Sequence, residues 1–403
     1  MLFFLWGVSN NLTDILVQQF KKSFELSPWQ AQLVQTAVFF GYFFMALPAA
    51  LAMRRWGYKF GIVAGLCLFG VGTLLFWPAA VVGRYSVMLA ALFVVGCGSA
   101  TLETAANPFI AQAGPLETSE RRLNFSQAFN PPGTIAGVLI GTFFIFSGVE
   151  LSPAQAAAMK LQHTYVPYLH TEIMRVVPTY VALGCIVLLL AAWIGLTRFP
   201  PAGERELHPP GSLLAQIAEL LRLPSLRTAI IAEFFYVGAQ VSTWSAFIPY
   251  IKQYTPATER TAGLLLIGNL VAFAAGRLCS TAVMRWFAPV RMMGLYCFVN
   301  MLLLAVVAAK PGPVGVGAIM ATSFFMSIMF PTIFATGVKG LGVRTKLAGS
   351  LLVMSIVGGA LLPPLVGLVA KYSGSYALGY LPVIACYVVV ALYSLRRGTA
   401  QAL

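Results

Sequence analysis

The sequence has very few charged residues and contains only one aspartate. Asp, Glu, Lys and Arg make up 9% of its 403 residues, whereas an ordinary soluble domain carries about 25%. The hydrophobic fraction is 59%. This balance excludes a soluble globular enzyme, a disordered chain and a disulfide scaffold. It predicts an integral membrane protein with many spans.

Several motifs of known chemistry are also absent. There is no phosphate-binding loop, which excludes an ATP-driven pump, and no HExxH or other metal-ligand cluster. The six cysteines stand singly, and the three histidines lie in predicted loops. No arginine-rich voltage sensor or TVGYG-like filter is present. We therefore expect no enzyme activity, no metal site and no cofactor other than a coupling ion.

The net charge of +14 does not indicate a nucleic-acid partner. The basic residues fall in short clusters between long apolar stretches, as membrane topology requires, and form no single patch.

Twelve apolar stretches of about 20 residues predict twelve transmembrane helices, because strands of a membrane barrel would alternate over about ten residues. The fold class expected is therefore all-α. The predicted spans are residues 1–20, 29–53, 60–80, 86–112, 122–147, 177–198, 228–251, 261–284, 290–309, 313–338, 347–370 and 376–395.

The distribution of Lys and Arg predicts the orientation. One set of loops and ends contains 16 of them and the other set contains 9, while Arg277 lies inside a span. The richer side is expected to be cytoplasmic, which places both termini inside a plasma (bacterial inner) membrane. The Pro- and Gly-rich segment 199–226 is expected to be a cytoplasmic linker between an N-terminal bundle, 1–198, and a C-terminal bundle, 227–403.

The two halves resemble each other. Similar segments recur about 225 residues apart, and each links span n to span n+6. The pairs are 53–56 with 284–286, 107–109 with 330–332, and 133–141 with 359–367. They predict two pseudo-symmetric six-helix bundles with a site at their interface.

Three acidic residues fall within predicted spans, namely Asp14, Glu103 and Glu233. A charge in the bilayer is expensive, so such residues usually pair or serve a pathway. Asp14 is interpreted as a buried proton acceptor, with an interfacial carboxylate in contact with water as the alternative. Glu103 lies far from either end of span 4, where burial favours its neutral form. A structural ion pair is the alternative for Glu103, although the first half has no Lys or Arg at a similar depth.

Amide and aromatic side chains also occur within the predicted spans. Carboxamides both donate and accept hydrogen bonds, which suits sugar hydroxyls, although they suit bonding between helices as well. Tyr236, Gln240 and Trp244 share a face of span 7 that could stack on a sugar ring or simply pack. The candidate substrate-binding residues are Asn11, Asn107, Asn124, Gln127, Asn130, Tyr236, Gln240, Trp244, Asn269 and Phe330.

Glu233 and Arg277 lie on consecutive antiparallel spans, at similar depths. We predict that they form a structural or gating ion pair.

At these residues the chain resembles the major facilitator superfamily and, within it, the fucose:proton symporter family with the bacterial glucose/galactose permeases. The resemblance covers essentially the whole chain. It is carried by LWGVSNNLTDIL in span 1, GSATLETAANPF and LNFSQAFNPPGTIAG in spans 4 and 5, FYVGAQVSTWS in span 7, and FMSIMFPTIFATGVKGLG and VMSIVGGALLPPLVG in spans 10 and 11.

This resemblance implies alternating access and proton-coupled uptake of L-fucose or a related hexose. It implies that Asp14 and Glu103 are the proton-linked carboxylates, and that Asn11, Gln127 and Asn130 line the substrate cavity. Sodium-coupled glucose/galactose-type transport and proton/drug antiport are the alternatives. The partners expected are a small sugar and membrane lipid, with the protein as a monomer.

Overall fold

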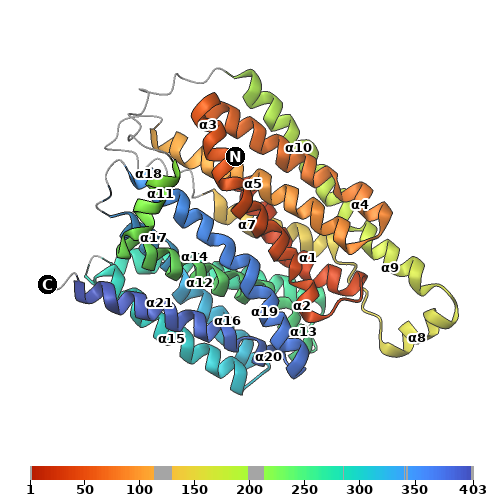
Figure 1. Cartoon of the computed structure of the whole chain (residues 1–403). Helices are drawn as coiled ribbons and strands as arrows, with labels where there is room; N and C mark the ends of the chain where they lie inside the picture. Colours follow the sequence, from red (N-terminus) through yellow and green to blue (C-terminus); the bar gives the residue numbers. More distant parts are fainter. Residues whose placement is uncertain are drawn as a thin grey trace.

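The computed structural model describes residues 2–112, 129–197, 213–284, 286–339, 341 and 344–400. All regular elements in these ranges are helices, which pack side by side in one elongated bundle (Figure 1). The all-α expectation is confirmed.

The first half of the chain forms helices that lie together at the upper right of Figure 1. They are α1 (Leu2–Ser23), α2 (Pro28–Ala31), α3 (Leu33–Leu74), α4 (Phe76–Val82), α5 (Tyr85–Gln112), α7 (Asn130–Ile140) with the π-helix η2 (Gly141–Ile145), α8 (Pro153–Leu161), α9 (Tyr165–Met174) and α10 (Val176–Leu196). Helix α3 contains two spans, which meet at the non-helical residue Gly57.

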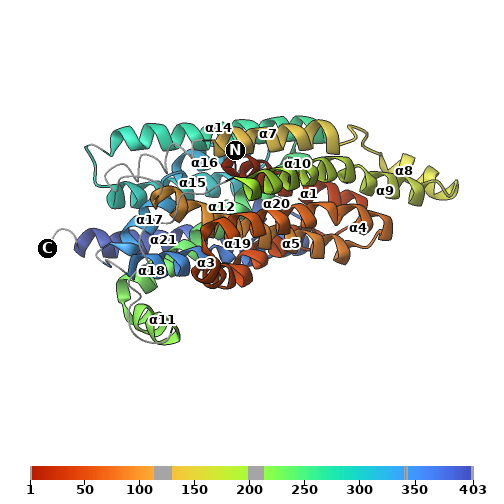
Figure 2. The same cartoon turned by 90° about the horizontal axis from the view of Figure 1, so that it is seen from above.

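The second half forms the lower left of the same view. It comprises α11 (Leu213–Arg222), α12 (Pro224–Ser245), α13 (Phe247–Tyr254), α14 (Glu259–Val283), α15 (Pro289–Ala309), α16 (Pro313–Met326), α17 (Met329–Val338), α18 (Thr345–Met354), the 3₁₀-helix η4 (Ser355–Val357), α19 (Gly358–Ser373), α20 (Tyr376–Gly379) and α21 (Leu381–Ala400). Figure 2 shows that α11, which falls in the predicted linker, projects from the bundle.

Nine helical segments in the described part of the chain are long and apolar enough to cross a membrane. The other three predicted spans correspond to α1, to the described part of 122–147 and to α12 with α13. These three are the spans that carry Asp14, Asn130 and Glu233 together with several other polar candidates. The span 122–147 falls short by length, because only the apolar helix Asn130–Ile145 is described. In α1 and in α12 with α13 the polar side chains themselves lower the hydropathy.

The two halves pair their helices in the same way. In the first half α1 packs on α7, and α3 packs on α5 and α10. In the second half α12 packs on α19, α14 packs on α16, and α15 packs on α21. The contact of α1 with α7 (spans 1 and 5) therefore matches that of α12 with α19 (spans 7 and 11). The contact of α3 with α10 (spans 3 and 6) matches that of α15 with α21 (spans 9 and 12).

Two glycines show how close the helices of these pairs lie. A Cβ at Gly133 would stand 2.1 Å from the backbone oxygen of Phe4, and a Cβ at Gly358 would stand 1.9 Å from the backbone oxygen of Phe234. Side chains cannot fit at either place, so the backbones of the two helices touch directly. Gly133 begins one of the repeated segments that the sequence indicated, and Gly358 directly precedes the matching segment 359–367.

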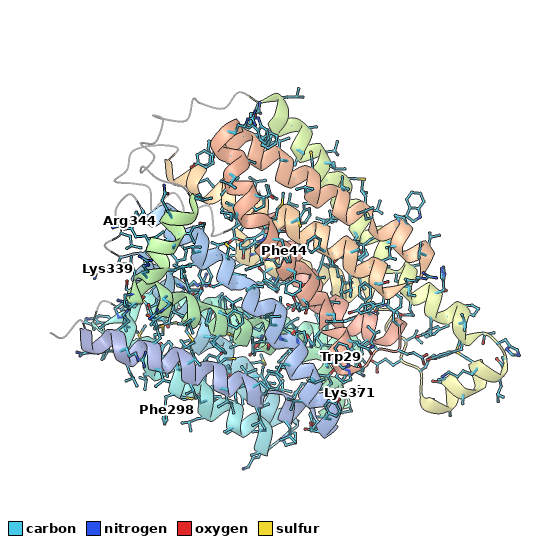
Figure 3. All side chains as sticks on the ribbon, viewed as in Figure 1. Trp29, Phe44, Phe298, Lys339, Arg344 and Lys371 are labelled. Atoms are coloured by element: carbon cyan, nitrogen blue, oxygen red, sulfur yellow. The ribbon has the colours of Figure 1, made fainter. Side chains whose placement is uncertain are left out.

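The bundle has two ends that differ in how the halves meet. We call the end that carries residues 24–27, 146–164 and 255–258 the distal end, and the end that carries both chain termini the terminal end. At the distal end α19 lies against α2 and α3, and η2 lies against α14. Figure 3 shows Trp29 and Lys371 close together there, while Lys339 and Arg344 mark the terminal end.

The predicted outer loop 148–176 contains two short helices. Its AQAAAMKLQ stretch falls in α8, which begins with a capping box in which Ser152 accepts from the backbone of Gln155. Helix α8 extends beyond the distal end of the bundle (Figure 1), whereas α9 packs against α1, α4 and α10.

Candidate functional site

Asp14 lies on α1 and is buried against α3. Its side chain is 5% exposed, and Gln35 Nε2 donates to its Oδ1 at 2.8 Å. One amide hydrogen bond can hold either form of the carboxyl, whereas a lysine or arginine would keep it charged. The position is therefore suited to a group that exchanges a proton.

Glu103 lies on α5 and faces the same two helices. The hydroxyl of Tyr42 interacts with its carboxyl, and Trp6 Nε1 donates to that hydroxyl at 2.6 Å. The other carboxyl oxygen, Oε2, is buried and has no partner among the described residues. The ion pairs of the described residues do not include Glu103. Glu103 is therefore not neutralised by a lysine or a guanidinium in this part of the chain.

Tyr42 connects the surroundings of the two carboxylates. Its hydroxyl also lies near Asn10, and Asn10 lies one helical turn from Asp14 on α1. A line of polar side chains thus runs from Asp14 through Asn10 and Tyr42 to Glu103. The sequence analysis did not single out Gln35 and Tyr42. Their spacing was a usable signal, because two polar residues seven positions apart in an apolar span lie on one helix face.

The candidate amides of the first half fall into two groups. Asn11 is buried, and its Nδ2 donates to Gly7 O at 3.3 Å, whereas its Oδ1 has no partner among the described residues. Asn130 begins α7 and donates to Phe3 O at 3.3 Å. Both therefore lie where α1 meets α7. Asn107 falls in α5, but its side chain lies outside the described part, as do residues Asn124 and Gln127.

The candidates of the second half form a polar chain between helices. Trp244 Nε1 donates to Ser323 Oγ at 3.1 Å, and that hydroxyl donates to Asn269 Oδ1 at 2.7 Å. Asn269 is fully buried, and its Nδ2 has no partner in the structure. A sugar hydroxyl could accept from this free amide hydrogen only if the surrounding helices move apart.

The other aromatic candidates pack in different ways. Tyr236 is fully buried, and its hydroxyl donates to Met326 O at 3.1 Å, so it contributes to the core in this structure. Phe330 stacks on Phe334 with ring centroids 6.2 Å apart. Gln240 lies half-buried on α12, one turn from Tyr236 and one turn from Trp244.

The predicted ion pair between Glu233 and Arg277 is wrong for this structure. Both carboxyl oxygens of Glu233 are buried and have no partner in the described part of the chain. Arg277 instead donates from Nε to Ser327 O at 3.3 Å and lies over the ring of Phe273. Their similar depth on neighbouring helices does not bring the two side chains together, because the side chain of Arg277 turns towards the end of α16 and the loop that follows it.

Charged side chains hold the two halves together at the distal end. Lys22 on α1 lies 2.8 Å from Glu172 of its own half and 3.3 Å from Glu259 of the other half. Gln18 Nε2 also donates to Glu259, at 3.2 Å. Both carboxylates are about 2% exposed, so their charges are largely shielded from water and Lys22 compensates them directly.

A second set of contacts extends this distal network. Glu150 of the first half accepts from the backbone nitrogen of Glu259 and forms an ion pair with Lys252, both in the second half. Thr36 donates to Ala360 O at 2.6 Å. The structure is therefore closed at the distal end. Sequence reasoning counted these residues only as loop charges, because nothing in the sequence places residue 22 beside residue 259.

Replacing Glu259 by glutamine is expected to weaken the distal closure. The amide keeps the shape of the side chain but loses the charge-assisted contact to Lys22, which shifts the population towards distally open molecules by roughly tenfold. Spin labels at the exposed positions Trp77 and Tyr372, in a chain whose six cysteines are replaced by alanine, would report the separation of the halves.

Glu25→Gln is the matched control for this measurement. Glu25 pairs with Lys160 at 3.6 Å within the same half, and both side chains are more than half exposed. The label distances should therefore stay as in the parent chain. Equal distances in Glu259→Gln and the parent would show that the carboxylate does not hold the halves together.

Comparison with known proteins identifies relatives over the full length. The sequence profile of the Major Facilitator Superfamily matches residues 1–351. An L-fucose-proton symporter of Escherichia coli (strain K12) is 39% identical, with 98% of this chain and 91% of the relative covered. A glucose/galactose transporter of Brucella abortus is 32% identical, with 98% and 92% covered. The crystal structure of the transporter FucP in the outward conformation has a TM-score of 0.74 at 38% identity, with 98% and 96% covered.

Proposed function

The chain belongs to the Major Facilitator Superfamily, and from this premise we propose that it is a proton-coupled symporter for L-fucose or a related hexose. It is a multi-pass membrane transporter and not an enzyme. Curated relatives act on L-fucose or on glucose and galactose. One observation carries the coupling proposal, namely that the half-buried Glu103 has a buried, unpartnered Oε2 and no cation beside it among the described residues.

The proton would load Glu103 while the distal end is open. A protonated carboxyl costs much less to enclose than a carboxylate, so loading makes closure around the sugar favourable. Asp14 and the hydroxyl of Tyr42 would relay the proton along the polar line described above. Release on the terminal side would then restore the charged, empty site.

The sugar would bind between the halves, near the two carboxylates. Asn11 offers an unused carbonyl oxygen and Asn269 an unused amide hydrogen, one from each half. These groups suit a hydroxyl that both donates and accepts. Asn107, Asn124, Gln127 and Gln240 would complete the polar lining, with Trp244 or Phe330 against an apolar sugar face.

Orientation follows from the loop charges. We place the distal end outside and the terminal end, with both termini, in the cytoplasm of a bacterial inner membrane, because the terminal end has the larger share of Lys and Arg. In this orientation the structure represents a state closed to the outside.

Uptake into proteoliposomes tests the proposal. Labelled L-fucose, glucose and galactose are offered with the outside more acidic than the inside, and then without a pH difference. We expect accumulation of at least one sugar only with the gradient, unchanged when choline replaces sodium. Accumulation that needs sodium and ignores pH would contradict proton coupling. Transport of lipophilic cations in place of sugars would favour a drug antiporter.

A further inference from the structure

A cavity separate from the proposed sugar site lies at the distal end, between the two halves. Its volume is about 410 Å³, which falls within the range of small-molecule sites. Helices α1 and α2 form one wall, and α13, α19 and α20 with their adjoining turns form the other. None of the candidate substrate residues lines it. The lining residues that matter for the argument are Gln18, Lys21, Lys252, Gln253, Lys371 and Tyr376.

The cavity has an excess of positive charge. Three of its lining residues are lysines and none is acidic. Lys252 is neutralised by Glu150, which lies outside the lining. Lys21 and Lys371 have no acidic partner among the described residues, and each contacts only an aromatic ring, 4.8 Å away at Tyr376 and 5.5 Å away at Tyr372. Two uncompensated ammonium groups therefore line one cavity.

Two buried polar atoms in the wall also lack partners. They are Gln18 Oε1 and the hydroxyl of Tyr376, whose side chains are 8% and 4% exposed. An unpartnered buried polar atom is costly, and an ordered water or a ligand can supply the partner that it lacks. Gln253 is satisfied at both ends, since it donates to Gly374 O at 2.6 Å and accepts from Tyr376 N at 2.8 Å. The wall that carries the tyrosine is thereby held in place.

We propose that this cavity binds a small phosphate monoester with hydroxyl groups, such as a sugar phosphate. Lys21 and Lys371 would contact the phosphate, whose two negative charges match theirs, and the Tyr376 hydroxyl would donate to it. Gln18 Oε1 would accept from a hydroxyl of the organic part. The volume exceeds what inorganic phosphate alone would fill.

Binding would also affect conformation. Because the ligand contacts α1 of one half and α19 and α20 of the other, it interacts with the closed distal end and not with an open one. A ligand that favours one state shifts the population towards it. The site would therefore act as a brake on opening at the distal end, and this consequence does not depend on which sugar the protein carries.

Calorimetric titration of the purified protein in detergent tests the site. The probes are glucose 6-phosphate, inorganic phosphate and glucose, at constant ionic strength set with chloride. We expect binding of glucose 6-phosphate and weaker binding of inorganic phosphate, both weakened in the lysine variants, whereas any heat from glucose should be the same in those variants and in the parent. Lys21→Gln and Lys371→Gln should each weaken binding by roughly tenfold, and Tyr376→Phe by a smaller factor. Lys310→Gln, a distal lysine outside the cavity, should bind like the parent.

The outcomes separate this proposal from the transport proposal, because the titration measures no sugar movement. Failure of both phosphates to bind, or equal binding by the Lys21→Gln/Lys371→Gln variant and the parent, would overturn it. A thermal unfolding midpoint recorded without ligand confirms that each variant is folded. If the Lys21→Gln protein does not fold, phosphate binding by the Lys371→Gln protein, at an exposed position, tests the site without it.

Discussion

Sugar accumulation driven by a pH gradient is expected to fall to background, at least about 100-fold, when Glu103 is replaced by glutamine, while sugar exchange continues. Glutamine imitates the protonated glutamate in shape and in neutral charge. The variant can therefore close around the sugar, but it cannot release a proton on the other side. Net uptake against a gradient needs that release, whereas exchange of labelled for unlabelled sugar does not.

Two measurements on one proteoliposome preparation test this expectation. Uptake with the outside acidic measures coupling, and exchange at equal pH with unlabelled sugar inside measures carrier movement. Glu25→Gln is the control, because this glutamate is exposed at the distal end and the same change there should leave both rates as in the parent. Gradient-driven uptake at the parental level in Glu103→Gln would remove Glu103 from the mechanism.

Replacing Gly133 by alanine is expected to destabilise the protein strongly. The added methyl group would stand 2.1 Å from the backbone oxygen of Phe4 and 2.8 Å from its carbonyl carbon. Backbone cannot rotate aside as a side chain can, so α1 and α7 must move apart. Overpacking of this kind costs about 1–3 kcal/mol and occasionally more. The thermal unfolding midpoint of the purified protein should fall by several degrees, with a lower folded yield.

Gly317→Ala provides the matched control. Gly317 also lies in a helix, α16, but a Cβ there meets nothing within 4 Å. Alanine favours helix over glycine by about 1 kcal/mol, so this midpoint should stay or rise slightly. Gly358→Ala tests the equivalent contact of the second half and should behave like Gly133→Ala. Similar midpoints for Gly133→Ala and Gly317→Ala would show that α1 and α7 do not pack as described.

The sequence predicted the fold well because the bilayer imposes a strong constraint. A span must be apolar over about 20 residues, and both its ends are marked by charges and turns. The repeat was also visible, although the segments 133–141 and 359–367 were aligned one residue away from the glycines with equivalent backbone contacts, Gly133 and Gly358. The domain boundaries at 198 and 227 stay a prediction, because residues 198–212 lie outside the described part.

The candidate site was predicted only in part. Buried carboxylates stand out in an apolar sequence, so Asp14 and Glu103 could be found from composition and depth alone. Partners could not be found in this way. The side chain of Arg277 selects the Ser327 carbonyl over Glu233, and Lys22 meets Glu259 across 237 positions. Such pairings depend on how helices rotate about their axes and how the halves dock, and the sequence pattern of single spans contains neither.

The contrast between the two kinds of helix contact determines where the molecule can bend. Within each half, backbone lies directly on backbone at glycines such as Gly133, and separating these helices would leave a void that no neighbouring group could fill. Between the halves at the distal end close contacts also occur, such as that of Gly367 with the backbone of Pro28 and Trp29. Ions and amides such as Lys22 and Glu259 add to them there, and water can solvate these polar groups as they part. Opening at the distal end therefore separates many contacts that water can replace, while each half moves with its internal packing intact.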